Sequence, residues 1–122
     1  PRYWMMKLPK RMNRPQKTHN PGNLRYAKQT EAIGKDEWGM AIFPNDPAGW
    51  RALHAQIALD QSRGMTVRQF VAKYAPEVEN NTSAYLQFVT KHMKCEPDEP
   101  LENLSRFALA GVIAVYEGYC AK

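Results

Sequence analysis

From Trp50 onward, apolar residues recur every three to four positions, which is typical of helices with one buried face. The first such stripe consists of Trp50, Leu53 and Ile57. It predicts a helix that begins after Asn45-Asp46, where either side chain can cap, and that ends at Gly64. A second, shorter helix is expected between a capping Thr66 and Pro76. Its stripe consists of Val67, Phe70, Val71 and Tyr74.

Two further helices are predicted toward the C-terminus. One begins at Asn81 or Thr82 and ends before Pro97. It carries apolar and aromatic side chains on adjoining faces, namely Tyr85, Phe88, Val89, His92 and Met93. The other starts at about Asn103 and contains residues 107–116, which are apolar on nearly all sides. Such a helix is expected at the centre of the fold.

The N-terminal part has a different pattern. Residues 24–27 and 40–43 are short strand-like runs separated by a polar stretch, and residues 20–23 form a turn ahead of them, so we expect a small hairpin. Residues 1–18 show no apolar periodicity, and the prolines at 9 and 15 interrupt any helix, which predicts an extended arm. The fold class is therefore predicted as α+β, predominantly α, with a single domain over residues 19–122 in which the hairpin precedes about four helices.

Composition limits the domain count and the location. A chain of 122 residues with 43% hydrophobic residues supplies one core. No apolar run approaches the roughly 20 residues that cross a bilayer, so no membrane span is expected. The N-terminus lacks a sustained hydrophobic region and a small-residue cleavage site, and we therefore expect no signal peptide.

The net charge of +5 is unevenly distributed. Residues 1–35 carry nine Lys and Arg side chains against one acid, Glu31. The basic residues of the arm that we expect to contact an anion are Lys7, Lys10, Arg11, Arg14 and Lys17. This pattern favours nucleic acid or an acidic surface as the partner, and a solvated or protein-docking tail is the alternative interpretation.

The sequence contains no recognisable cofactor or metal site. Phosphate-binding glycine loops, zinc spacings, nucleophile elbows and dinucleotide fingerprints are absent, so no cofactor and no metal are expected. The three histidines have no obvious partners and are interpreted as structural or surface residues. Cys95 and Cys120 lie 25 positions apart without metal-ligand spacing. Free thiols are the leading interpretation for them, and a disulfide is the alternative.

Glu117 is the leading candidate for a catalytic residue. It follows an apolar helix, where desolvation raises the pKa of a carboxyl and the helix C-terminus disfavours negative charge, so an acid that donates a proton is reasonable there. In the alternative interpretation Glu117 lies beyond the buried turn and is exposed. Glu79 is the candidate second carboxylate, with capping or solubility as its alternative role. The residues expected to bind substrate are Asn20, Asn23, Arg25, Tyr26, Phe43, Asn80 and Tyr85.

Three segments carry a recognisable pattern, namely Asn20-Pro21-Gly22-Asn23-Leu24-Arg25, Gly39-Met40-Ala41-Ile42-Phe43 and Ala48-Gly49-Trp50-Arg51-Ala52. Together they resemble a family of phage and prophage virion structural proteins whose hallmark is an Asn-Pro-Gly-Asn-Ile-Arg motif. A fourth, residues 74–85, is similar to the family's Trp-Ala-Pro-Pro-x-Glu-Asn-Asp-Thr-x-x-Tyr pattern but lacks the second Pro. Where the family has His-Glu-Asn-Gly, this chain has Tyr116-Glu117-Gly118-Tyr119.

A more distant likeness is to lysozyme-like peptidoglycan glycosidases, in which a helix ends in a Glu beside a small β-hairpin. In this chain the parts occur in permuted order. The resemblance implies a virion-associated enzyme that cleaves peptidoglycan through Glu117, located in the virion or, before assembly, in the bacterial cytoplasm. The alternative is a non-catalytic virion accessory protein that docks on other virion proteins and whose arm binds nucleic acid or an acidic partner.

Overall fold

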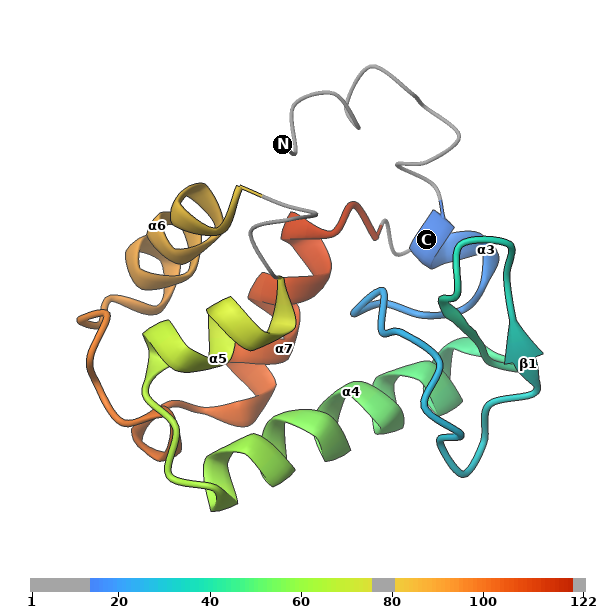
Figure 1. Ribbon diagram of the computed structural model, residues 1–122, viewed down its shortest axis with the longest axis horizontal. Coiled ribbons are helices and arrows are strands. Elements are labelled where there is room, and N and C mark those ends of the chain that lie inside the picture. Colours follow the sequence, from blue (N-terminus) through green and yellow to red (C-terminus); the bar gives the residue numbers. More distant parts are fainter. Residues whose placement is uncertain (1–13, 76–80, 120–122) are drawn as a thin grey trace.

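The computed structural model describes residues 14–75 and 81–119. Its class is α+β, mainly α, as predicted (Figure 1). A short helix and a two-stranded hairpin come first and the longer helices follow. The elements are α3 (Arg14–Lys17), β1 (Gly34–Lys35), β2 (Ala41–Ile42), α4 (Asp46–Ser62), α5 (Val67–Tyr74), α6 (Thr82–Met93), the 3₁₀ helix η1 (Leu101–Asn103) and α7 (Arg106–Tyr116).

The starts of the three middle helices lie where the sequence predicts them, because each has a local cap. Asn45, rather than Asp46, accepts from the backbone of the first turn of α4. Thr66 forms a reciprocal capping box with Gln69 at the start of α5. Asn81, rather than Thr82, caps α6. Such caps satisfy backbone N–H groups that have no partner inside the helix.

The predicted hairpin is present, but its first strand is β1 and not residues 24–27. The antiparallel pair is β1 with β2, in the register Gly34 with Ile42. Residues 24–27 contribute only an isolated bridge between Arg25 and Met40. Left-handed backbone at Asn23 (φ 49°) and Lys28 (φ 57°) turns the chain on both sides of this segment, which leaves it too short for a strand of its own.

The extended arm is also corrected where the structure describes it. Residues 14–17 form the helix α3, in which Arg14 is 3% exposed. Its guanidinium carbon lies 4.1 Å from the ring centroid of Trp38, a cation–π contact in which the Trp38 residue itself stays 45% exposed. Pro15 is compatible with this helix because a first-turn residue needs no backbone donor. The rest of the predicted arm, residues 1–13, lies outside the described residues.

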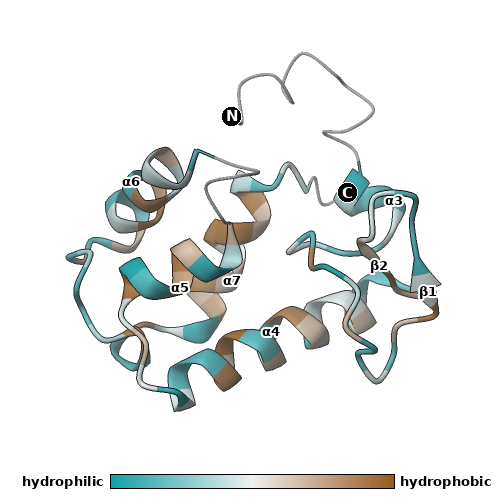
Figure 2. Ribbon diagram, in the orientation of Figure 1, coloured by the Kyte–Doolittle hydropathy of each residue, from teal (hydrophilic) through white to brown (hydrophobic). Residues whose placement is uncertain are grey.

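The core lies where α4, α5, α6 and α7 meet, with α7 packed against both α4 and α6. Hydrophobic and hydrophilic residues alternate along α4 and α5, as expected for helices with one buried face (Figure 2). A smaller cluster under the hairpin consists of Ala41, Phe43 and Ala48. The helix α7 is predicted at the centre of the fold and packs against two helices, but one of its faces is open, since Phe107 is 75% and Val115 66% exposed. Neighbouring helices cover two sides of α7 and leave this face open.

Candidate functional site

Glu117 lies at the C-terminal end of α7 with its side chain turned inward. The residue is 8% exposed. Its Oε2 accepts a hydrogen bond from the Tyr85 hydroxyl on α6 at 2.8 Å, and its Oε1 accepts one from Asn23 Nδ2 at 3.3 Å. The carboxyl therefore joins three segments that are far apart in the sequence. The structure places it against the Asn-Pro-Gly-Asn turn and not on the open surface.

The turn that meets Glu117 is held rigidly by Asn20. This side chain is fully buried; its Nδ2 donates to the carbonyls of Leu24 and Ala41 at 2.9 Å, and its Oδ1 accepts from the Leu24 N–H at 2.9 Å. Both donor positions of the amide and one of its two acceptor positions are thus in use within the turn. Because the side chain is also closed off from solvent, the prediction that Asn20 binds substrate is wrong: its role is to position the turn.

Gly22 lets the turn pack closely on the helices. A Cβ at this position would lie 2.6 Å from the Tyr74 hydroxyl oxygen and 2.7 Å from Leu53 Cδ1, which is closer than carbon atoms approach. The same Tyr74 hydroxyl donates to the Gly22 carbonyl. The next residue, Asn23, has left-handed backbone (φ 49°), a conformation that Asn tolerates better than most residues. This geometry directs the Asn23 amide to Glu117.

The environment of Glu117 contains opposing influences. Burial and the helix C-terminus favour the neutral acid, whereas the two donors, Tyr85 and Asn23, favour the carboxylate. The second polar atom of Asn23, Oδ1, is buried and has no hydrogen-bond partner within residues 14–75 and 81–119.

Of the other residues predicted to bind substrate, some are buried and some lie at the surface. Phe43 is 1% exposed beneath the hairpin, so its proposed contact with substrate is wrong: alternation along the strand turns this ring into the core. Tyr85 is 1% exposed and contacts Glu117. We therefore reassign it from substrate binding to holding the carboxyl. Tyr26 is half-buried against the hairpin cluster, and Arg25 is exposed.

Several predicted residues fall outside the described part of the chain. They are Glu79, Asn80, Lys7, Lys10 and Arg11. Of the two arm residues that are described, Lys17 is exposed, whereas Arg14 is buried against Trp38. The prediction that Arg14 offers a charge to an anion is therefore wrong, because its guanidinium is covered within the fold.

A second polar group, which the sequence did not indicate, adjoins the turn. His19 Nδ1 lies 2.7 Å from Asp46 Oδ1, and the Tyr119 hydroxyl donates to Asp46 Oδ2 at 2.9 Å. The hydrogen bond from His19 is the largest influence on the Asp46 carboxyl and, with that from Tyr119, lowers its pKa despite some burial. Trp50 packs edge-on against Tyr119 with ring centroids 5.5 Å apart. His19, Asp46 and Tyr119 come from separate segments of the chain. In the sequence, only the adjacency of His19 to the Asn-Pro-Gly motif could have drawn attention to this group.

The surroundings of two other titratable side chains, Asp60 and His54, are explained by their contacts within the fold. Asp60 is 1% exposed, and its carboxylate accepts from Lys73 at 2.9 and 3.0 Å, from Arg63 at 3.0 Å and from Gln56 at 3.0 Å. This network joins α4 to α5 and pairs the buried carboxylate with two cations. Burial is the main cause that lowers the pKa of His54, and the charge of Arg106 adds to it.

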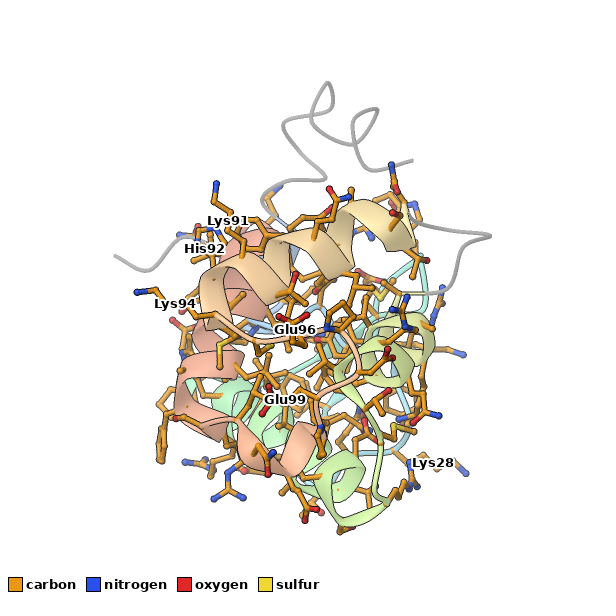
Figure 3. The ribbon with its side chains drawn as sticks, turned by 90° about the vertical axis from the view of Figure 1, so that its left-hand side faces the viewer. Lys28, Lys91, His92, Lys94, Glu96 and Glu99 are labelled. Atoms are coloured by element: carbon orange, nitrogen blue, oxygen red, sulfur yellow. The ribbon has the colours of Figure 1, made fainter. Side chains whose placement is uncertain are left out.

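Cys95 is a free thiol in the described structure. Burial is the main cause that raises its pKa, and the carboxylates of Glu99 and then Glu96 raise it further. Figure 3 shows both carboxylates in the segment after α6, whose C-terminal end carries the exposed Lys91, His92 and Lys94. A thiol with this environment is a weak nucleophile. Cys120 lies outside the described residues.

A surface groove of about 360 Å³ runs between α4 and residues 29–31. Arg51 donates to both carboxylate oxygens of Glu31 at 2.6 and 2.7 Å, and this hydrogen bonding lowers the pKa of Glu31. These are the only charged residues in the lining, and they neutralise each other. The groove therefore has fewer features of a reaction site than the surroundings of Glu117.

Among residues 14–75 and 81–119, no group of three or more His, Cys, Asp or Glu side chains is arranged to hold a metal ion. In the same residues, no helix combines the length and apolar character that crossing a membrane requires. Comparison of the chain with protein-family models and with curated proteins gave no match. Among the described residues, the carboxyl of Glu117 and its surroundings form the candidate functional site.

Proposed function

We propose that this protein is a phage virion-associated, lysozyme-like protein that cleaves glycosidic bonds of peptidoglycan, with Glu117 as the general acid. The observation that carries the proposal is the placement of Glu117. A carboxyl that is 8% exposed ends an apolar helix and is held by hydrogen bonds to both oxygens. Hydrolysis of a glycosidic bond requires a proton donor of this kind at the leaving oxygen.

The surroundings of Glu117 suit a group that loses and regains a proton. Burial and the negative end of α7 favour the neutral acid before the reaction. After proton donation, the hydroxyl of Tyr85 and the amide of Asn23 stabilise the carboxylate that forms. Because each oxygen has its own partner, the carboxyl also has a fixed orientation, which lowers the entropic cost of reaching the transition state.

The resemblance of the Asn-Pro-Gly-Asn-Leu-Arg segment to phage virion proteins supports a role in the virion. The chain also has Glu at position 117, where the family's His-Glu-Asn-Gly pattern has Glu. Two-residue glycosidase mechanisms also need a group that activates water or attacks the sugar. Glu79 remains a proposal for that group. It follows α5 at the junction before α6, and α6 supplies the Tyr85 contact to Glu117.

A non-catalytic accessory protein of the virion is the second candidate function. The observation that favours it is the open face of α7, where Phe107 and Val115 are 75% and 66% exposed. Large apolar side chains on a surface are frequent where proteins dock on one another. In this alternative Glu117 serves only to fasten the turn to α6 and α7.

A cell-wall assay separates the two functions. Purified protein is applied to a zymogram of cell walls, and the loss of turbidity of a wall suspension is followed for the wild type, Glu117→Gln and Glu102→Gln. Glu102 is an exposed carboxylate in η1 and is the matched control. We expect clearing by the wild type and the control, and a loss of about 100-fold or more for Glu117→Gln, the contribution typical of a general acid. Equal clearing by Glu117→Gln, or none by the wild type, contradicts the enzymatic proposal.

A further inference from the structure

The group formed by His19, Asp46 and Tyr119 has the geometry of an oriented base. A carboxylate only accepts hydrogen bonds, so the 2.7 Å contact requires that His19 Nδ1 carries a proton and donates it to Asp46. In a neutral imidazole the other nitrogen, Nε2, is then the acceptor. Nε2 has no hydrogen-bond partner within the described part of the chain, and the His19 side chain is 44% exposed. Asp46 is fixed in turn by the Tyr119 hydroxyl at 2.9 Å.

Local structure alone does not require this arrangement. The start of α4 is already capped by Asn45, which accepts from the Ala48 N–H at 3.0 Å, so the side chain of Asp46 is not needed as a cap. The backbone of His19 is already fixed against α4, because a Cβ on Gly49 would lie 1.9 Å from the His19 carbonyl oxygen. The pairing of the imidazole with Asp46 therefore adds orientation to a side chain whose backbone is positioned by other contacts.

The oriented imidazole and Glu117 adjoin the same two segments. His19 immediately precedes the turn whose other end, Asn23, donates to Glu117. Tyr119, which holds Asp46, is two residues beyond Glu117, a separation of at most about 7 Å along the chain. Figure 1 shows the chain after α3 passing beside the C-terminal end of α7. One junction thus presents a carboxyl and an oriented imidazole, an acid and a base of different chemistry.

We propose that His19, in place of the sequence candidate Glu79, is the general base of the reaction, and this inference rests on the proposed glycosidase function. Glu117 donates its proton to the glycosidic oxygen as the bond from that oxygen to the anomeric carbon breaks. A water molecule forms the new bond to the anomeric carbon, and its proton passes to His19 Nε2. Asp46 stabilises the imidazolium that results. Transfer of a proton to solvent from His19 and uptake of one by Glu117 restore the starting state.

The test uses two substrates and an external nucleophile with the wild type, His19→Ala, His19→Gln and Glu117→Gln. The substrates are cell walls and a nitrophenyl glycoside of an N-acetylglucosamine oligomer, whose leaving group departs without a proton. We expect Glu117→Gln to recover on the nitrophenyl substrate and the His19 variants to remain slow on both, by about 100-fold. Azide needs no base, so it should restore turnover in His19→Ala and yield a glycosyl azide detectable by mass spectrometry.

Thermal unfolding of each variant by circular dichroism shows whether the fold is retained. Wild-type rates in His19→Ala and His19→Gln, together with an inactive Glu117→Gln, would overturn the role of His19 and leave the proposed function standing. Inactive, folded His19 variants that azide does not restore would likewise assign His19 a structural role. Absence of activity in the wild type on both substrates would overturn the proposed function and the base together.

Discussion

Replacing Asn20 by alanine tests whether one buried amide holds the turn that faces Glu117. The substitution leaves the Leu24 N–H without its acceptor and removes one donor each from the carbonyls of Leu24 and Ala41. The Leu24 carbonyl keeps the Ala41 N–H at 2.9 Å as a second partner, so it is not left unsatisfied. The main loss is therefore one buried N–H donor, with two weaker losses at carbonyls.

The size of the effect follows from these contacts. A buried unsatisfied donor costs about 1–3 kcal/mol and each lost hydrogen bond about 0.5–1.5 kcal/mol. Entry of water into the space left by the amide offsets part of this, so we expect the free energy of unfolding to fall by about 2–4 kcal/mol. Asn20→Asp should be at least as destabilising at neutral pH, because it places a carboxylate beside two carbonyl oxygens.

Urea denaturation followed by circular dichroism measures this change. With a slope of about 2 kcal/mol per molar urea, the midpoint should fall by about 1–2 M at constant slope. Asn103→Ala is the matched control. Asn103 is exposed and its side chain donates only to Glu99, at 3.2 Å, so its loss should stay within about 0.5 kcal/mol. If Asn20→Ala lies within about 1 kcal/mol of the wild type, the three hydrogen bonds do not hold the turn as argued.

Three further results are expected. The pKa of Asp46 is lowered, chiefly by the hydrogen bond from His19, so the ionised carboxylate stabilises the fold above the unfolded pKa of 3.8. This contribution is lost as the pH falls through the pKa of the folded state. In thermal unfolding, Asp46→Asn should therefore lessen the loss of stability at acid pH. Alkylation of Cys95 at neutral pH, followed by peptide mass spectrometry, should be slow in the folded protein and faster in Glu99→Gln; equal rates contradict the electrostatic part of the argument. Replacing the basic residues of segment 1–13 by serine should weaken binding to DNA or anionic vesicles, and binding that does not change between about 50 and 200 mM salt excludes an electrostatic arm.

The sequence by itself determined the fold class and the starts of most helices. Asn45, Thr66 and Asn81 begin helices through hydrogen bonds that reach only three residues along the chain. Signals of that range are complete in the local sequence, as is the pattern that buries one face of α4 or α5. The placement of Glu117 at the end of an apolar helix follows from the same local information.

Only the tertiary structure decided which polar residues meet. Nothing local distinguishes the buried Asn20, which holds the turn, from Asn23, which contacts a carboxyl 94 positions away. Likewise, the contacts of Asp46 with His19 and Tyr119 span 27 and 73 positions. Such pairs form because burial of the apolar faces brings distant segments together, and polar groups carried inward must then find partners. Tertiary packing therefore creates the candidate site, whereas the local sequence determines the helices that support it.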